Sequence, residues 1–436
     1  MAMPPVKRKR PEILAPAGDR ERLLAALRYG ADAVYLAETR FGMRSAPANF
    51  TPEGLREAVR LAHAAGAKAY VACNVLPRNG EIDELPAYLE TVQDAGADAL
   101  IAADLGVLSL ARRYAPRCAV HISTQTGVVN YEAARMLYEL GASRVVLARE
   151  LSLAEVAELC ARVPAGLEVE CFVHGAMCMS VSGRCLLSNV LAGRDANHGD
   201  CAQPCRWKYH LIEEKRPGEE YEIGEGEGGS YLLNANDLCM IDHIAALAEA
   251  GVASFKIEGR AKAAYYVAAV TNAYRSAVDA YERAGFPADY RPDSWMREEL
   301  DKVSHRPYGT GFYFGMPKQH IQSGGYIREY EVAAVVEGYA EGRLLLSQRN
   351  HFRRGEVLDV LEPGQEPFFL PAEELYDGEG MPIDCAPHPT MKLQIPWPRP
   401  LAEGSFLRRK TTKGKALETG RESTGNRQPK AGSTVG

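Results

Sequence analysis

The sequence predicts an α/β protein in which a (β/α)8 TIM-like barrel is followed by a small C-terminal all-β domain. Over the first 290 residues, eight short β-like runs alternate with amphipathic helical stretches. Gly30, Gly66, Gly96 and Gly141 each follow a helical stretch, and glycine readily takes the left-handed conformation that ends a helix. Residues 326–410 contain short strand-like runs between Gly, Pro and Asp turns. Because counting units cannot establish that the sheet closes, a doubly wound sheet is the alternative.

The barrel domain is predicted to occupy residues 11–290. Its predicted strands are Glu12–Ala15, Ala33–Leu36, Lys68–Ala72, Ala99–Ala102, Ala119–Ile122, Arg144–Leu147, Leu167–Val173 and Ser254–Ile257. The predicted helices include Asp19–Tyr29, Pro52–Ala65, Ile82–Ala95, Tyr131–Leu140, Leu153–Ala161 and Tyr265–Ala284.

Other segments differ from this pattern in composition. Residues 213–230 are rich in Glu and Gly and are predicted to form an exposed loop. Residues 291–325 are predicted to be a linker with at most a short helix, and 326–410 a small β-barrel or sandwich. Residues 411–436 have almost no large apolar side chain, which predicts a disordered basic tail.

The overall composition is that of a soluble enzyme, with 46% hydrophobic and 25% charged residues. The net charge of −6 argues against a uniformly basic nucleic-acid binder, although both ends of the chain are basic. Those ends suit either phosphate contacts or solvated tails. With no apolar run of membrane-spanning length and no signal-peptide pattern, we expect a cytoplasmic protein whose cysteines are reduced.

A barrel places the residues that follow its strands on one rim, where active sites of this fold lie. Polar residues follow nearly every predicted strand. They occur in segments 16–19, 38–44, 73–74, 104, 123–125, 149–150, 174–205 and 258–260. We therefore expect the chemistry of this protein at that rim.

Four of the ten cysteines are clustered within 28 residues that follow the seventh predicted strand: Cys178, Cys185, Cys201 and Cys205. Four thiolates can complete the coordination of an iron–sulfur cluster or of a structural zinc ion. Zinc sites usually pair cysteines two to four residues apart, which the gap between Cys178 and Cys185 does not suit. The spacing favours iron–sulfur slightly and leaves zinc open.

The cysteine segment also resembles a known family. Its pattern Glu170-x-Phe172-x-x-Gly175-Ala-Met-Cys178-x4-Gly183-x-Cys185-x-Leu-Ser188 is similar to the signature of the collagenase-like peptidases of unassigned catalytic type, the U-class family thirty-two. Further blocks resemble the family at 14–18, 30–35, 41–44, 120–125, 145–150 and 255–260. The likeness extends over about residues 11–410, and it is greatest to the branch that hydroxylates RNA.

The resemblance implies an iron–sulfur-dependent and oxygen-independent hydroxylase carrying a 4Fe–4S cluster, with prephenate as co-substrate and oxygen donor. It implies tRNA as the partner, with 5-hydroxyuridine formed at the wobble position. Relatives also hydroxylate ribosomal RNA or ubiquinone. The implied ligands are Cys178, Cys185, Cys201 and Cys205, with Cys239 in reserve for the fourth. The remaining cysteines are predicted to be small buried or strand residues: Cys73, Cys118, Cys160, Cys171 and Cys385.

Candidate substrate-binding and catalytic residues stand near the ends of predicted strands. The arginines Arg44, Arg149 and Arg260 suit the two carboxylates of prephenate, since a guanidinium binds a carboxylate bidentately. The alternative is structural ion pairing, of Arg149 with Glu170 or of Arg260 with Glu258. His121 and Gln125 are predicted to orient substrate, or His121 to be a hydrogen-bonded core residue. Glu170, His174 and Glu258 are predicted proton-transfer groups, unless the glutamates only hold arginines.

Two other functions stay open. The first is a peptidase, which would need a nucleophile and a base; Cys178 with His174 is the candidate pair. No Gly-x-Ser-x-Gly or His-Glu-x-x-His motif is present. The second is that of a cluster-bearing accessory subunit of a hydroxylase complex. RNA contacts are expected from the β domain and the tail, with residues 351–354 stacking on bases or simply forming an exposed loop.

Overall fold

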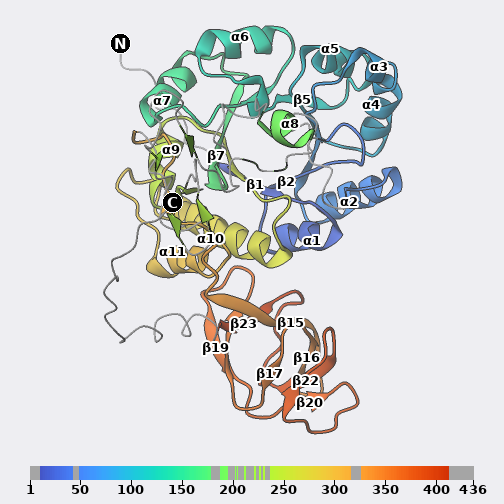
Figure 1. Ribbon diagram of the computed structural model, residues 1–436, viewed down its shortest axis with the longest axis vertical. Coiled ribbons are helices and arrows are strands. Elements are labelled where there is room, and N and C mark those ends of the chain that lie inside the picture. The colour runs from blue at the N-terminus through green and yellow to red at the C-terminus, as the bar shows by residue number, and fades with distance from the viewer. Residues whose placement is uncertain are drawn as a thin grey trace, which may run out of the picture.

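The computed structural model describes residues 10–42, 49–177, 187–194, 236–315 and 326–411, with short stretches at 202, 204, 211–212, 220–221, 225–226 and 229–230. The first part of the chain is a barrel of parallel strands surrounded by helices (Figure 1). Its strands are β1 (Glu12–Pro16), β2 (Ala33–Leu36), β3 (Lys68–Cys73), β4 (Ala99–Ala102), β5 (Ala119–Ile122), β6 (Arg144–Val146), β7 (Glu168–Gly175) and β13 (Ser254–Ile257).

The barrel is closed by strand β13. It pairs in parallel with β1, where Ile13 stands opposite Phe255, and in parallel with β7, where Phe255 stands opposite Cys171. The first and last strands of the series are thereby joined, which excludes the doubly wound alternative and confirms the predicted fold. The predicted strands overlap the observed ones throughout.

Helices cover the outside of the barrel. They are α1 (Arg20–Arg28), α2 (Pro52–Ala64), α3 (Asn79–Ile82), α4 (Leu85–Asp94), α5 (Leu105–Tyr114), α6 (Tyr131–Glu139), α7 (Leu153–Arg162), α9 (Ile244–Glu249) and α10 (Ala264–Arg283). The chain over Ile82–Ala95, expected to be one helix, is divided between the end of α3 and α4. Pro86 lies in the first turn of α4, where a proline is tolerated because the missing N–H would have no partner within the helix. None of the described helices is both long and apolar enough to span a lipid bilayer.

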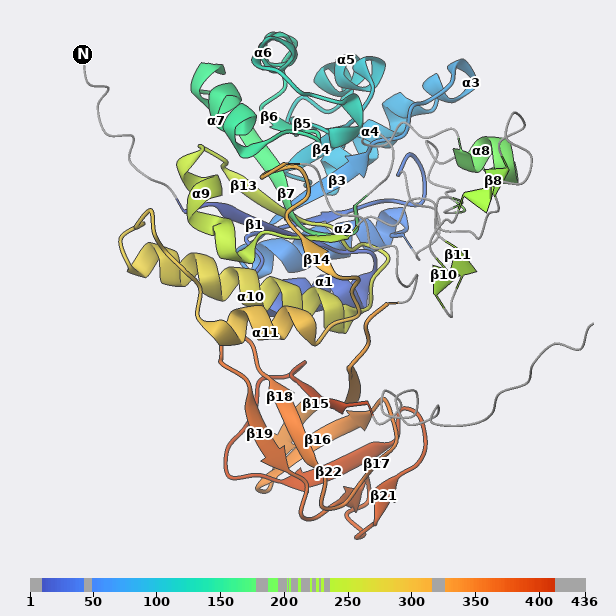
Figure 2. The same cartoon turned by 60° about the vertical axis from the view of Figure 1, so that its left-hand side comes forward.

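The barrel sheet continues beyond β7. Strand β12 (Asp237–Cys239) runs antiparallel to the carboxyl end of β7, and β14 (Tyr308–Gly309) pairs with β12. Helix α11 (Ser294–Asp301) packs on α10 through the buried Met296 and Leu300 (Figure 2). The described part of the predicted linker, 291–315, therefore contains α11 and β14 and lies against the barrel.

The chain between β7 and β12 is described only in fragments. These are α8 (Leu187–Ala192) and two short antiparallel pairs, β8 (Leu211–Ile212) with β9 (Glu220–Tyr221) and β10 (Glu225–Gly226) with β11 (Gly229–Ser230). Two 3-10 turns, η1 (Thr124–Thr126) and η4 (Ile241–His243), complete the barrel body.

The C-terminal domain is an antiparallel β structure with its own apolar core. Its strands are β15 (Tyr330–Ala340), β16 (Arg343–Gln348), β17 (Phe352–Arg353), β18 (Val357–Leu361), β19 (Phe368–Pro371), β20 (Tyr376–Asp377), β21 (Cys385–Ala386), β22 (Lys392–Pro396) and β23 (Phe406–Lys410). Phe352 is fully buried in that core. Its ring therefore cannot stack on a base. The stacking expected of segment 351–354 is wrong for Phe352. Of the predicted tail, 411–436, all but Thr411 lies outside the described residues.

A buried ion-pair network joins the barrel to the β domain. Arg408 on β23 is fully buried, and its guanidinium lies 2.5 Å from Glu299 of α11 and 3.1 Å from Asp359 of β18. Lys302 lies 2.7 Å from both carboxylates. Since a buried charge without a partner costs several kcal/mol, these contacts hold the two domains in one relative position.

Candidate active site at the mouth of the barrel

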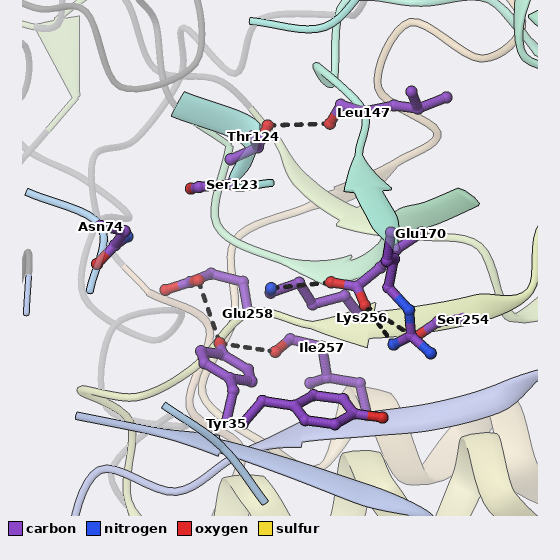
Figure 3. A network of polar contacts seen from close by, with 12 residues as sticks. Tyr35, Asn74, Ser123, Thr124, Leu147, Glu170, Ser254, Lys256, Ile257 and Glu258 are labelled. Atoms are coloured by element: carbon purple, nitrogen blue, oxygen red, sulfur yellow. Dashed lines mark hydrogen bonds and ion pairs between the residues drawn. The ribbon is translucent and has the colours of Figure 1, made fainter. Parts of the chain in front are cut away.

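The lower interior of the barrel, towards the amino ends of its strands, holds a network of charged side chains. Arg144, at the start of β6, places Nη1 2.6 Å from Glu12 and 3.0 Å from Glu170, and Nη2 2.6 Å from Glu168. Lys256 on β13 donates to the other oxygen of Glu170 at 2.9 Å. Charged side chains are rarely this buried unless they are paired. Figure 3 shows Glu170, Lys256 and Ser254 converging inside the barrel.

Glu170 is held ionised by this network. Burial opposes ionisation, but Lys256 and then Arg144 outweigh it and lower the pKa of the Glu170 carboxyl to about 2. A carboxylate that stays ionised at neutral pH and is bonded by two cations and Ser254 is poorly suited to proton transfer. Its position favours the structural alternative, with Arg144 and Lys256 as partners in place of the expected Arg149.

Lys256 connects this network with the mouth of the barrel. Its ammonium lies 4.7 Å from the ring centre of Tyr35, a favourable cation–π distance. The Tyr35 hydroxyl lies 3.0 Å from the Ile257 carbonyl oxygen and 3.4 Å from Glu258 Oε2 (Figure 3). Glu258 is half-buried, directly after β13, on the rim where active sites of barrels lie. It remains the better placed of the two predicted glutamates for proton transfer.

Two amides stand on the same rim. Asn74, after β3, donates from Nδ2 to Oε1 of Gln125 at 2.6 Å, and the Ser123 hydroxyl lies 3.4 Å from the same oxygen. Gln125 is 5% exposed, and its buried Nε2 has no hydrogen-bond partner within the described parts of the chain. Gln125 lies in the turn η1 that Ser123 caps, directly after β5. Such a buried donor is available to a bound substrate.

His121 lies deeper, inside the barrel. Its ring packs edge-on against Tyr70 with 4.6 Å between ring centres. Burial, and next the charge of Arg144, lower the pKa of His121 to about 3, so the imidazole is neutral at physiological pH. These contacts place His121 below the mouth, as a packed core residue with a ring nitrogen, Nδ1, that has no partner among the described residues.

His174 faces away from the barrel interior. Alternation along β7 would turn it inward with Glu170 and Phe172, but the pairing of β7 with β13 is irregular between Phe172 and His174. Such a bulge redirects the following side chain. The His174 ring lies among Tyr266 and Tyr274 of α10 and Tyr308, 5.3–6.0 Å away.

This environment does not support the predicted acid–base role of His174. Burial, and next the nearby His305, lower the pKa of His174 to about 3, and neither ring nitrogen has a hydrogen-bond partner in the described structure. Cys239, the reserve ligand, stands opposite His174 in the β12–β7 pair and is also buried. Burial raises the pKa of its thiol to about 11.

Two of the three predicted arginines are described, and both lie at the rim. Arg149, after β6, donates to the carbonyl oxygen of Ala176 at 2.9 Å and lies over the ring of Phe172. Arg260, after β13, is 4% exposed, and its carbonyl oxygen would lie 2.1 Å from a Cβ at position 18. Only glycine fits at Gly18, because the β1 and β13 loops meet there. Arg44 lies outside the described residues.

The four predicted cluster ligands also lie outside the described residues, and the described residues contain no group of three or more metal-binding side chains. One described contact involves their neighbours in sequence: Ser188, fully buried, accepts a hydrogen bond from the Ala202 amide at 2.9 Å. These residues follow Cys185 by three positions and Cys201 by one. Of the other cysteines, Cys73, Cys118 and Cys171 are buried, whereas Cys160 and Cys385 are half-buried.

Sequence reasoning missed several residues of this site. Arg144 and Lys256 lie on predicted strands of a barrel, and a charged residue on a strand that is buried on both faces signals an internal ion pair. That signal was available. Asn74 stands in segment 73–74, which was expected at the rim, although no role was assigned to it. Tyr35 carried no comparable signal, because only the closed barrel brings it to Glu258.

Comparisons with known proteins agree with this architecture. Residues 18–323 match the model of Peptidase family U32, and residues 328–408 match the Peptidase family U32 C-terminal domain. The chain is 37% identical to tRNA hydroxylation protein P1 of Bacillus subtilis, covering 92% of this chain and 95% of that protein. It is 34% identical to tRNA hydroxylation protein P of Escherichia coli, covering 89% and 94%.

A third relative is named for the modification of a different RNA. The 23S rRNA 5-hydroxycytidine C2501 synthase of Escherichia coli is 37% identical over 71% of this chain and 46% of its own length. The family models together span both domains of the structure, from the loop after β1 to β23. This chain therefore belongs to peptidase family U32.

Proposed function

We propose that this protein is a cytoplasmic RNA hydroxylase that forms 5-hydroxyuridine at the wobble position of tRNA, without molecular oxygen and with prephenate as the oxygen donor. The observation that carries the proposal is similarity over nearly the whole chain to two proteins named for tRNA hydroxylation. A third relative, named for the hydroxylation of cytidine in ribosomal RNA, supports RNA as the substrate class.

The proposed cofactor is a 4Fe–4S cluster held by Cys178, Cys185, Cys201 and Cys205. Four thiolates are a complete ligand set for such a cluster, and the Ser188–Ala202 hydrogen bond links the segments that follow Cys185 and Cys201. These residues fit the group. When bound, the cluster would supply redox chemistry or an iron that binds substrate.

The chain's own residues would bind and orient the reactants. Arg149 and Arg260, which follow β6 and β13 at the rim, would bind the carboxylates of prephenate. The buried Nε2 of Gln125 would donate to a carbonyl or carboxylate oxygen of a bound reactant. Glu258, hydrogen-bonded with Tyr35, would hold or move a proton at the carboxylate oxygen Oε2.

The geometry does not favour peptidase chemistry. Within the described residues, no histidine is hydrogen-bonded to a hydroxyl or a thiol, so no nucleophile–base pair is formed there. His174, the base expected for Cys178, is enclosed by tyrosine rings.

Nucleoside mass spectrometry of tRNA from a deletion strain tests the substrate. We expect 5-hydroxyuridine and the nucleosides derived from it to disappear, and to return when the wild-type gene is restored. A strain carrying Cys178→Ala should remain deficient although the protein accumulates. Unchanged nucleosides in the deletion strain would contradict the tRNA assignment.

Purification without oxygen tests the cofactor and the need for a partner. We expect brown protein with iron and sulfide in equal amounts, both lost in Cys178→Ala. The purified protein should hydroxylate tRNA when prephenate is added. Activity that returns only with cell extract would identify an accessory subunit, and casein cleavage that survives removal of iron would identify a peptidase.

A further inference from the structure

The side-chain amide of Gln125 is oriented by its two neighbours. Its Oε1 accepts a hydrogen bond from Asn74 Nδ2 at 2.6 Å and lies 3.4 Å from the Ser123 hydroxyl. The Ser123 oxygen accepts from the Gln125 backbone amide at 3.3 Å, so its own proton is free to be donated to Oε1. The amide nitrogen Nε2 is buried and has no hydrogen-bond partner in the part of the chain that the structure describes. The end of this side chain that remains for a ligand is therefore a donor.

The turn η1, which carries Gln125, is fastened on both sides. Thr124 Oγ1 donates to the carbonyl oxygen of Leu147, directly after β6, at 2.9 Å (Figure 3). Thr126 Oγ1 donates to the carbonyl oxygen of Ala103, directly after β4, also at 2.9 Å. The donor thus has a fixed position relative to the barrel, and a preorganised group loses little entropy when a ligand binds to it.

The amide pair lies in the uppermost layer of the barrel interior. The rings of Tyr70 and His121 pack against each other inside the barrel, and residues two or four positions further along a strand face the same side. Asn74 follows Tyr70 by four residues, and Ser123 follows His121 by two. Glu258 follows β13, which is opposite β4 in the closed order of the eight strands. A ligand in the mouth would therefore lie between the amide pair on one side and Glu258 on the other.

The surroundings of the free donor suit a neutral carbonyl oxygen better than an anion. The hydrogen-bond partners of Gln125 among the described residues, Asn74 and Ser123, are both uncharged. In the layer below, His121 is neutral because burial lowers its pKa to about 3. A carboxylate is held best by a cation, and the arginines for that task follow other strands, β6 and β13. We therefore look for a ligand with an uncharged acceptor.

We propose that Gln125 donates to the 4-carbonyl oxygen of the target uracil and that this contact selects uridine over cytidine. The inference rests on the proposed function, because it takes uridine in RNA as the substrate. Uracil has an acceptor oxygen where cytosine has an amino donor, on the ring carbon beside the C5 atom that would be hydroxylated. Cytosine would place its amino group against Nε2 and leave two buried donors without an acceptor. Asn74 is a positioning residue, because it holds the oxygen end of the amide away from the base.

Gln125→Glu tests the donor with the least change of shape. It puts an oxygen in place of Nε2, while the other oxygen still accepts from Asn74 and Ser123. Anaerobically purified full-length protein is given prephenate and one of two anticodon stem-loop RNAs, which differ only in having uridine or cytidine at the wobble position. We expect the wild type to favour uridine in kcat/KM by about tenfold to hundredfold, and this ratio to fall at least about tenfold in the variant. The KM for prephenate should be unchanged.

Asn74→Asp reverses the donor by a second route. Since an aspartate accepts where Asn74 donates, the Gln125 amide should turn to give Nε2 to it and present Oε1 to the base. The ratio should shift in the same direction although Gln125 is unchanged, which a loss of stability alone would not cause. Gln93→Glu is the matched control, because Gln93 accepts from the Arg117 backbone amide at 2.8 Å before β5, at the opposite end of the barrel. It should leave the ratio as in the wild type.

The outcomes separate this inference from the proposed function. A Gln125→Glu variant that melts like the wild type and keeps its ratio overturns the contact with the 4-carbonyl, while hydroxylation of uridine by the wild type would stand. A raised KM for prephenate with an unchanged ratio assigns the donor to that reactant and overturns the inference as well. Equal rates of the wild type on the two RNAs overturn it whether or not the variants fold. A wild type that hydroxylates neither RNA overturns both proposals.

Discussion

The lower interior of the barrel and its mouth differ in how their polar side chains are paired. In the interior, Glu170 is bonded by Arg144, Lys256 and Ser254, and its pKa is strongly lowered. At the mouth, Gln125 leaves a buried amide donor without a partner in the described structure, and Glu258 is half-buried. A fully paired network rigidifies a fold, whereas an unpaired buried donor costs stability that a bound ligand can restore. The comparison therefore assigns stability to the interior and chemistry to the mouth.

Removing the central carboxylate should cause the largest loss of stability. Glu170→Ala leaves Lys256 buried without its ion-pair partner, and breaking a buried pair costs about 3–5 kcal/mol. Chemical denaturation of the apo-protein measures this. Glu168→Ala is the control, because Glu168 contacts the same Arg144 but is 54% exposed, and it should cost less than about 1 kcal/mol. Equal effects of the two variants would contradict the assignment of stability to the interior.

Acid should weaken the interior network through Glu170. Its pKa is lowered from 4.5 to about 2 on folding, so its contribution is complete above pH 4.5 and is lost as the pH falls towards 2. The lost stabilisation is about 3 kcal/mol. The free energy of unfolding, measured from pH 6 to pH 2.5, should fall less steeply in Glu170→Gln than in the wild type. Parallel curves for the two proteins would show that Glu170 does not titrate in this way.

At the mouth, we expect a change in rate with little change in stability. Glu258→Gln keeps the hydrogen bond with Tyr35 but cannot move a proton, and loss of a general acid or base lowers the rate about 100-fold or more. Single-turnover hydroxylation of tRNA measures the rate, and thermal unfolding should be within a few degrees of the wild type. Glu132→Gln, on the exposed surface of α6, is the matched control. Full activity of Glu258→Gln would remove Glu258 from the mechanism.

The amide of Gln125 should have the smallest effect of the four. Gln125→Leu keeps the size of the side chain but removes the buried donor together with the oxygen that accepts from Asn74. One neutral hydrogen bond is worth about 1 kcal/mol, or roughly a fivefold rise in KM. Separate titrations of prephenate and tRNA show which reactant Gln125 binds. If neither KM changes, the unpaired donor does not face the substrate.

Much of the fold was predictable because its signals are local. Alternating apolar runs placed the barrel strands, and Gly30, Gly66, Gly96 and Gly141 do adopt positive φ angles of 75–103° after their helices. The predicted linker was the weakest part. Helix α11 is short and β14 has two residues, so each depends on packing against α10 and β12 rather than on its own sequence.

The candidate site was predictable in position but less so in roles. Gln125, Arg149, Arg260 and Glu258 do lie at the rim, because residues that follow parallel strands must meet there. His174 was expected at the same site and lies outside it, since the bulge in the β7–β13 pair turns its ring towards α10. A one-residue irregularity of strand pairing reverses the face of a side chain and leaves no signal in the apolar pattern.

By itself, the sequence determined the barrel class, the residues at its rim and the cysteine motif of the family. The signals for these are the period of the hydrophobic residues, the glycines that end helices and the spacing of the motif, and all three are properties of residues that are close together in the chain. Only the tertiary structure decided that Glu170 is an ion-pair partner and Glu258 a mouth residue, although both stand on or just after a barrel strand. The pKa and role of a charged group depend on which distant charges and how much water surround it, and closure of the barrel sets both.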